Sequence, residues 1–413
     1  MESEKTIYVY ENWSGNIPKL IGRLYADIAR GKENYSFEFD DKWLAECRFA
    51  FPVDSDINLY RGRQYTPAGK VMFGIFSDSC PDRWGRRLMQ RRENIIARRE
   101  SRKPRTLQEC DFLLGVYDES RMGALRFALE EGGDFLSHDK EFATPSWVSL
   151  RKLEAASMAY EKDETGLDDR WVTQLIAPGS SLGGARPKAS VEAPDGSLWI
   201  AKFPSRNDEY DVAAWEMVVH ELAFRCGLDV PEAKLEKFSK NGSTFLVKRF
   251  DRLKNRRIHF SSAMTMLGKT DGDHDGSYLE IAAFIKGHGA RPADDLRELW
   301  RRIVFNMAVS NTDDHFRNHG FLLTSKGWVL SPVYDVNPVP YGDMLSLNVD
   351  ETDSMIDIDL ALSVSEQFGI KLSEAKKMAD EILEVVSVYP DVAKEAGISR
   401  NGIMYMEAAF MKK

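Results

Sequence analysis

The order of its secondary-structure patterns constrains this chain more than any other feature. Short stretches with strand character fill residues 182–260, whereas the sequence from Ser261 onward is mainly helical and contains one hairpin. Strands followed by helices favour an α+β fold over alternating strand–helix units. Two further strand patterns lie near the start, at Thr6–Tyr10 and Tyr35–Phe39, and the alternation in the second indicates one buried face.

The length of the chain predicts more than one domain. At about 150 residues per domain, the 413 residues correspond to two or three domains. The polar stretch Glu161–Asp169 indicates a surface connection close to the first boundary. We therefore predict a small α/β domain at 1–150, a strand-rich part with a glycine-containing loop at 151–260, and a mainly helical part at 261–413.

Charge and cysteine content exclude several classes of protein. A net charge of -9 argues against a protein that binds DNA over its whole surface. The basic segment Arg83–Arg105 still allows a local DNA-binding patch. The simpler interpretation of that segment is a solvated helix face that ends near Pro104. The four scattered cysteines indicate a reducing compartment, and the sequence has no secretion signal and no membrane-spanning stretch. We expect a cytoplasmic protein without a membrane partner.

The hairpin predicted near the catalytic candidates brings distant residues together. Apolar runs flank the turn Ser325-Lys326-Gly327, and a hairpin joins its two ends. Asn318, just before the hairpin, and Asp335, just after it, should therefore converge.

The residues around this hairpin have the spacing of a kinase catalytic loop. Asp313 precedes Asn318 by five residues, as in kinases, where the Asp accepts the proton of the acceptor hydroxyl and the Asn holds Mg²⁺. We predict Asp313 as the catalytic residue and Asn318 and Asp335 as Mg²⁺ ligands. His315 is expected to order this loop, and a polar loop with a capping Asp is the alternative.

Three further signals suit the binding of a phosphorylated nucleotide. The loop Ser180–Lys188 contains Gly183, Gly184 and Ala185, whose small size lets backbone N–H groups approach phosphate, and Lys188 adds charge. Lys202 lies on the apolar face of a strand, and Glu216 on the apolar stripe of a helix over residues 211–226. Each is costly to bury alone, so the two are natural partners. A flexible turn, an edge-strand lysine and a boundary glutamate are the simpler alternatives.

Taken in order, these segments resemble the HipA family of bacterial serine/threonine kinases, the toxin half of type II toxin–antitoxin modules. The similarity covers nearly the whole chain. The matching segments are Phe76–Arg83, Ser181–Lys188, Trp199–Pro204, Glu216 with Gly227–Pro231, Phe245–Arg252, Asn311–Asn318 and Tyr334-Asp335.

The resemblance implies a bilobal kinase-like body behind a small amino-terminal domain, and the use of ATP and Mg²⁺. It places Lys202, Glu216, His315 and the glycine loop, Ser181 included, at the nucleotide. It also implies autophosphorylation at Ser181, with the adjacent Ser180 as a second candidate. The added charge would expel the loop from the nucleotide and inactivate the enzyme.

The resemblance also implies partners. They are a HipB-like helix-turn-helix antitoxin, operator DNA reached through that antitoxin, and a protein substrate such as an aminoacyl-tRNA synthetase. Two other functions stay open at this point. One is a small-molecule or lipid kinase on a related fold, and the other is a non-catalytic co-repressor that binds through Arg83–Arg105.

Overall fold

The structure of the protein is a computed structural model. The structure describes residues 4–29, 32–46, 51–138, 140, 143–162, 175, 184, 186–254, 256–273 and 275–410. Two compact units divide the chain, the first formed by Met1–Ser205 with Asp251–Ser261 and the second by Arg206–Phe250 with Ser262–Lys413. Both units contain part of the strand-rich segment 151–260, and the predicted three-part division stays a prediction.

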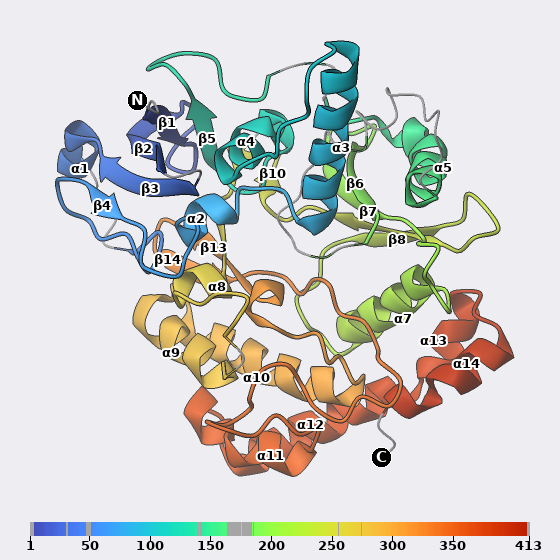
Figure 1. Cartoon of the computed structure of the whole chain (residues 1–413). Helices are drawn as coiled ribbons and strands as arrows, with labels where there is room; N and C mark the ends of the chain where they lie inside the picture. Colours follow the sequence, from blue (N-terminus) through green and yellow to red (C-terminus); the bar gives the residue numbers. More distant parts are fainter. Residues whose placement is uncertain are drawn as a thin grey trace. The chain divides into compact units, whose positions relative to one another are not determined.

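The first unit contains a five-stranded antiparallel sheet in the order β4-β3-β2-β1-β5 (Figure 1). Alternating apolar residues of its strands, such as Ile7 and Val9 on β1 and Phe37 on β3, are buried at 1% exposure or less. Both predicted strands near the start are therefore confirmed. The strands are β1 (Lys5–Glu11), β2 (Lys19–Ala29), β3 (Lys32–Phe39), β4 (Gln64–Tyr65) and β5 (Leu125–Ala128).

Helices and two short hairpins complete the described part of the first unit. The helix α3 begins at the basic segment, and it ends at Arg99 because the chain turns at Ser101, which has a φ of 52°. The helices are α1 (Asp41–Glu46), α2 (Gly74–Ser77), α3 (Arg83–Arg99), α4 (Glu109–Gly115) and α5 (Leu150–Glu161), with 3-10 turns η1 (Asp118–Ser120) and η3 (Trp147–Ser149). The hairpins pair β6 (Lys188–Glu192) with β7 (Leu198–Lys202), and β10 (Arg252–Leu253) with β11 (Arg256–Arg257).

A late segment of the chain, Asp251–Ser261, belongs to the first unit, and several of its polar side chains, such as Asp251 and Arg257, are buried there. The Asp251 carboxylate accepts a hydrogen bond of 2.8 Å from the backbone N–H of Gly123. The Arg257 guanidinium lies 2.9 Å from the Asp118 carboxylate, with exposures of 5% and 4%. Because a buried charge is costly without its partner, this return segment is an integral part of the first unit.

The second unit is mainly helical around α10. One face of this helix is apolar and fully buried, since Leu299, Trp300, Ile303 and Met307 have an exposure of 0%. The helices α9 and α12 pack against α10 (Figure 1). The helices are α7 (Val212–Arg225), α8 (Ala263–Met266), α9 (Tyr278–His288), α10 (Pro292–Ala308), α11 (Ile358–Ser363), α12 (Leu372–Ser387), α13 (Tyr389–Glu395) and α14 (Arg400–Met406), with 3-10 turns η4 (Phe316–Asn318), η5 (Ser365–Phe368) and η6 (Glu407–Ala409).

Two strand pairs also lie in the second unit. The strands β8 (Ala233–Glu236) and β9 (Thr244–Lys248) are antiparallel. The predicted hairpin is confirmed as β13 (Gly320–Thr324) and β14 (Gly327–Leu330), in which Phe321 pairs with Leu330. The short strand β12 (Phe260–Ser262) lies where the chain passes from one unit to the other. Among the described residues, no helix is both long and apolar enough to cross a membrane.

Candidate active site

The hairpin of the second unit brings the predicted catalytic residues together, as the sequence indicated. The Tyr334 hydroxyl donates a 2.7 Å hydrogen bond to the Arg317 carbonyl, which ties the segment after β14 to the residue just before Asn318. Asp335 is close enough to Asp313 for its negative charge to act on the Asp313 carboxyl. Asp313, Asn318 and Asp335 therefore share one site.

Asp313 presents its carboxylate to solvent. Its side chain is 72% exposed, and the His315 Nε2 lies 3.6 Å from its Oδ1. Desolvation by the surrounding loop, and then the charge of Asp335, raise the pKa of Asp313, whereas His315 opposes them. A neighbouring carboxylate that raises a pKa strengthens a group as a base. The position of His315 beside Asp313 is consistent with its predicted role in ordering the loop.

Asn318 supplies a buried oxygen that the protein leaves without a hydrogen bond. The residue is 8% exposed, and its amide Nδ2 donates a 2.6 Å hydrogen bond to the Asp313 carbonyl. Its Oδ1 is buried and has no hydrogen-bond partner among the described residues. Because such an oxygen costs free energy unless something binds it, it fits an electropositive ligand.

Asp335 has an unusual backbone conformation for its residue type. Its φ is 58°, in the left-handed region that costs non-glycine residues free energy and that is enriched at functional sites. No group of three or more His, Cys, Asp or Glu side chains suited to a metal occurs in the described part of the chain. The donors here are one amide and one carboxylate, a small set that suits Mg²⁺ when substrate phosphates complete its coordination.

A buried hydrogen-bond network holds the loop that carries Asp313 in place from its buried side. Asp314 is 1% exposed, and its carboxylate accepts hydrogen bonds from the Tyr278 hydroxyl and, at 2.6 Å, from the Ser346 backbone N–H. Asn306 donates to the Tyr278 hydroxyl at 2.9 Å, and Asn311 donates to Asn306 at 3.1 Å. Burial raises the pKa of Asp314 to about 6. The network joins three segments of the unit, so it holds the exposed Asp313 on a rigid base.

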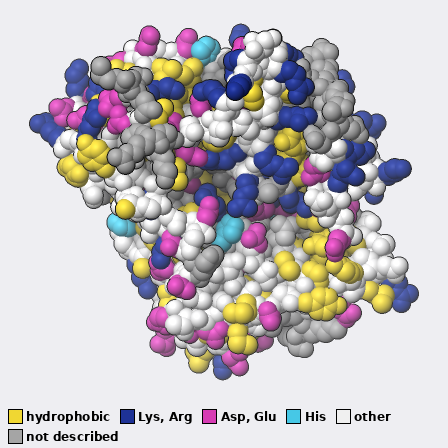
Figure 2. Space-filling view, in the orientation of Figure 1, with side chains coloured by type: hydrophobic (Ala, Val, Ile, Leu, Met, Phe, Trp, Pro, Cys, Tyr) yellow, Lys and Arg dark blue, Asp and Glu magenta, His cyan; other side chains and the backbone are white. Residues whose placement is uncertain are grey.

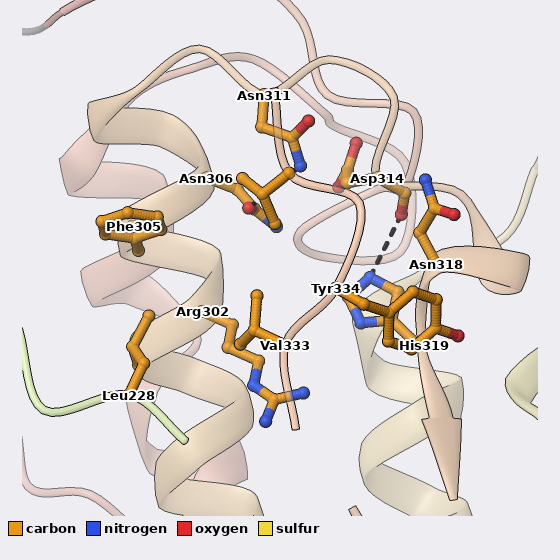
Figure 3. A pocket seen from close by; sticks show the side chains of 11 residues that line it. Leu228, Arg302, Phe305, Asn306, Asn311, Asp314, Asn318, His319, Val333 and Tyr334 are labelled. Carbon is orange, nitrogen blue, oxygen red and sulfur yellow. Dashed lines mark hydrogen bonds between the residues drawn. The ribbon is translucent and has the colours of Figure 1, made fainter. Parts of the chain in front are cut away.

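Several of these residues surround a small cavity beneath the loop (Figure 3). Its volume is about 10 Å³, close to the space that one water molecule needs. In Figure 3, Asn306 and Arg302 come from α10, Asn318 lies before β13, and a dashed line joins Asp314 to His319. The Asp314 carbonyl and His319 Nε2 are 3.2 Å apart. The cavity is too small for a nucleotide, so any nucleotide must lie on the exposed side of the loop.

The sequence analysis did not predict the buried hydrogen bond between Asp314 and Tyr278. Asp314 stands next to Asp313, and no local pattern separates the buried carboxylate from the exposed one. Tyr278 lies 36 residues earlier, at the start of α9. Pairing over that distance depends on the tertiary fold.

The nucleotide-binding candidates are divided between the two units. Lys202 ends β7 in the first unit and is half-buried. Glu216 lies on α7 in the second unit and is 5% exposed, as its place on the apolar stripe predicted. The ion pair between them stays a prediction. Ser180, Ser181, Gly183 and Ala185 lie outside the described residues.

The structure gives Lys188 a partner that the sequence did not predict. Its ammonium lies 3.0 Å from the Asp82 carboxylate, with exposures of 6% and 3%. Asp82 also caps α3 by accepting a 2.8 Å hydrogen bond from the Gly85 N–H, and Trp84 donates a 3.0 Å hydrogen bond to the Lys188 carbonyl. Lys188 therefore anchors the end of the glycine loop to the start of α3. The binding of nucleotide by Lys188 stays a prediction.

Gly184, the described glycine of this loop, lies close to the same anchor. Its φ is 96°, and a Cβ added to it would lie 3.0 Å from the Lys188 Nζ. Glycine is therefore the residue that this position accommodates without strain.

The comparisons with known proteins agree with the predicted family and fold. The model of the HipA-like C-terminal domain matches residues 180–389, so the chain belongs to that family. HipA from a Shewanella oneidensis complex with HipB and operator DNA has a similar structure, with a TM-score of 0.63 at 14% identity over 98% of this chain and 94% of that one. The predicted α+β fold of the HipA type is thereby confirmed.

Two relatives from Sinorhizobium fredii are named as candidate kinases. Y4mE is 31% identical in an alignment of 191 residues that covers 40% of this chain and 44% of the relative. Y4dM is 24% identical in an alignment of 315 residues that covers 71% of this chain and 69% of the relative. The chain thus spans less than half of the first relative's length and about two thirds of the second's.

Proposed function

We propose that the protein is an ATP- and Mg²⁺-dependent serine/threonine protein kinase of the HipA type. The observation that carries this proposal is the grouping of Asp313, Asn318 and Asp335. One is an exposed base with a raised pKa, one has a buried oxygen without a hydrogen bond, and one has a strained backbone. A structural loop needs none of these three features.

Asp313 would accept the proton of the acceptor hydroxyl. The exposed carboxylate of Asp313 can reach a substrate. The hydrogen-bond network around the neighbouring Asp314 limits the motion of Asp313. Positioning of this kind is a large part of catalysis in phosphoryl transfer. The Asn318 side chain holds the Asp313 carbonyl, so the base and the proposed metal ligand are mechanically linked.

Asn318 and Asp335 would hold Mg²⁺ through their side-chain oxygens. When bound with ATP, Mg²⁺ neutralises charge on the phosphates and makes the terminal phosphoryl group transferable. Lys202 would add a positive charge at the phosphates, and Glu216 would orient it. The Lys188–Asp82 pair would anchor the end of the glycine loop.

The finer parts of the proposal concern regulation and partners. We infer autophosphorylation at Ser181, or at the adjacent Ser180, as an inactivating switch. The HipA from Shewanella is found with HipB and operator DNA, which supports a HipB-like antitoxin as partner and a place as the toxin of a toxin–antitoxin module. An aminoacyl-tRNA synthetase is the proposed substrate on the strength of the family resemblance.

The test is mass spectrometry of the full chain after phosphatase treatment and incubation with ATP and Mg²⁺. We expect one added phosphate at Ser180 or Ser181. Asp313→Asn should slow its appearance by roughly 100- to 10,000-fold, because a general base contributes that much. Glu366→Gln, an exposed carboxylate on η5, is the matched control and should keep the native rate.

Three outcomes would contradict the proposal. Phosphorylation of Asp313→Asn at the native rate would remove Asp313 from the chemistry. Failure of the dephosphorylated chain to bind ATP would remove the nucleotide altogether and favour a non-catalytic binding protein. Phosphorylation of a lipid or metabolite, with none on a purified synthetase, would instead assign the activity to a different kinase class.

A further inference from the structure

A large groove on the second unit lies outside the candidate active site. Its volume is about 1090 Å³, and it shares no lining residue with the cavity beneath the catalytic loop. Its walls are α7 with the turn before it, β8 with Ser243, and the segment from α13 to α14. Figure 2 shows hydrophobic side chains gathered in the region where Figure 1 draws α7 and α13. Pockets for small ligands usually measure roughly 300–1000 Å³, so this groove has room for a short peptide.

The floor of the groove is apolar and firmly packed. Its apolar surface includes the half-buried Met217 of α7 and Leu235 of β8. Trp215 and Val218 of α7 and Val392 of α13, with exposures of 1%, 0% and 3%, pack beneath that surface. Phe410 supports Trp215, with ring centroids 5.8 Å apart. A floor built this way keeps its shape without an occupant, which lowers the cost of binding one.

An aromatic pair forms one wall. The rings of Tyr210 and Tyr405 lie 5.7 Å apart, and Tyr405 is 45% exposed. Tyrosines that combine an apolar ring with a polar end are enriched where proteins bind one another. The exposed ring of Tyr405 can cover an apolar side chain that enters the groove.

The lining carries more negative than positive charge. Five of its residues are carboxylates, Glu209, Asp211, Glu221, Glu236 and Glu395, and one is a lysine, Lys237.

Some of these carboxylates already have partners. Asp211 caps α7 and accepts hydrogen bonds from Ser243. Arg225, beside the groove, lies 2.7 Å from Glu221 and 3.5 Å from Glu395. Glu236 is exposed and has no ion pair among the described residues. A net negative rim around an apolar floor attracts cationic peptides and repels nucleic acids and phosphorylated ligands.

We propose that this groove docks a short, basic, amphipathic segment of a partner protein. One or two large apolar side chains of the segment would pack on Met217 and Leu235, which line the groove and are half-buried, beside the ring of Tyr405. Flanking lysines or arginines would reach Glu236 and Glu395. This is the helix-in-groove mode of recognition, with acidic residues that select for charge.

The groove also bears on α7, the helix that carries Glu216. Residues on both sides of Glu216 in the sequence, Trp215 and Met217, line the groove. An occupant would therefore restrict the motion of the helix that presents Glu216. This consequence rests on the proposed function, whereas the docking itself does not.

The test uses a library of random 16-residue peptides displayed on phage. The library is selected on the immobilised full chain and counter-selected on a triple variant, Tyr405→Ala with Glu236→Lys and Glu395→Lys. We expect enriched peptides that combine Lys or Arg with Leu, Phe or Trp at helical spacing. No enrichment over the triple variant would overturn the proposal, and so would enrichment of acidic peptides.

The top peptide, synthesised with a fluorescent label, then gives affinities by anisotropy. We expect binding to weaken at least tenfold in Tyr405→Ala and, separately, in Glu236→Lys with Glu395→Lys, because each removes a different element of the groove. Glu366→Lys, which lies outside the lining, should leave the affinity unchanged.

Folding is checked by the circular dichroism of each variant, and the charge-reversal variant serves if Tyr405→Ala unfolds. Equal affinity for the native chain and every folded groove variant would overturn the proposal. Self-association that the groove variants abolish would also overturn it, by assigning the groove to a second copy of the chain. None of these results depends on kinase activity.

Discussion

The proposed catalytic loop and the Lys188 anchor each hold a charged side chain in place, but they do so in opposite ways. At the proposed catalytic loop, the proposed base Asp313 is exposed, and buried polar residues beneath it hold it in place. At the anchor, the charged group Lys188 is itself buried, and its partner Asp82 comes from more than 100 residues earlier in the chain.

The two regions use charge for different purposes, one for reaction with a substrate and the other for stability of the fold. An exposed carboxylate remains available to a substrate and contributes little to stability. A buried ion pair contributes to the fold chiefly because the loss of either member leaves the other uncompensated. Mutation of the two regions should therefore have different consequences, the first on activity and the second on stability.

The largest expected effect is on the anchor. Lys188→Met removes the cation that lies 3.0 Å from the buried Asp82 carboxylate, and we expect the free energy of unfolding of the first unit to fall by about 3–5 kcal/mol. Urea denaturation measures it, with the exposed Lys240→Met as control. Asp82→Asn combined with Lys188→Met should restore most of the loss. A decrease below about 1 kcal/mol would show that Lys188 is not a buried structural charge.

The next effect concerns the pH dependence of stability. Burial raises the pKa of Asp314 from 3.8 to about 6, so the unfolded chain loses this proton at a lower pH than the folded chain does. The folded state is therefore favoured below about pH 4, and this contribution is lost as the pH rises through about 6. Relative to Asp314→Asn, the native protein should lose on the order of 3 kcal/mol across this range.

Urea titrations at several pH values between 4 and 7 measure this difference. Asp343→Asn, at an exposed carboxylate, is the control and should leave the pH dependence as in the native protein. Parallel curves for the native protein and Asp314→Asn would show that Asp314 ionises as freely in the folded state as in the unfolded chain.

A smaller effect tests the network between Asp314 and α10. Tyr278→Phe removes the hydroxyl that joins the Asp314 carboxylate to Asn306. We expect a loss of about 2 kcal/mol in the free energy of unfolding, because two buried polar groups lose their partner. Tyr341→Phe, on an 81% exposed side chain, should change stability by less than about 0.5 kcal/mol. Equal effects of the two substitutions would contradict the network.

The smallest expected effect sharpens the role of Asn318. Asn318→Ala removes the buried Oδ1 and should raise the Mg²⁺ concentration for half-maximal phosphorylation roughly tenfold, while other ligands still hold the metal. The measurement is a Mg²⁺ titration of phosphate transfer, with the exposed Asn241→Ala as control. An unchanged Mg²⁺ requirement, with a lower rate at saturation, would assign Asn318 to positioning of Asp313 alone.

The convergence of the proposed catalytic residues could be predicted because the sequence information for it is local. The hairpin follows from apolar runs around a turn, and Asp313, Asn318 and Asp335 lie within 23 residues of one another. The apolar stripe of α10 and the buried place of Glu216 on α7 follow from helical periodicity. The fold class follows from the order of these patterns and from the family resemblance.

The anchor and the polar network could not be predicted because they depend on pairing between distant segments. Lys188 carries the charge expected of a phosphate-binding residue, and only the fold reveals Asp82 beside it. The same holds for Asp314 and Tyr278. The extent of each unit also escaped prediction, since no sequence pattern shows that Asp251–Ser261 returns to the first unit.

That return segment has a consequence for how the protein is made. The ribosome releases the chain in order, and the first unit lacks Asp251 and Arg257 until Ser261 has emerged. Because synthesis adds roughly 5–20 residues per second, several seconds pass after Ser205 is made before all segments of the first unit are available to fold together. During that interval the backbone N–H of Gly123 and the Asp118 carboxylate lack the partners that Asp251 and Arg257 later supply. The amino-terminal region therefore matures only after part of the next unit exists.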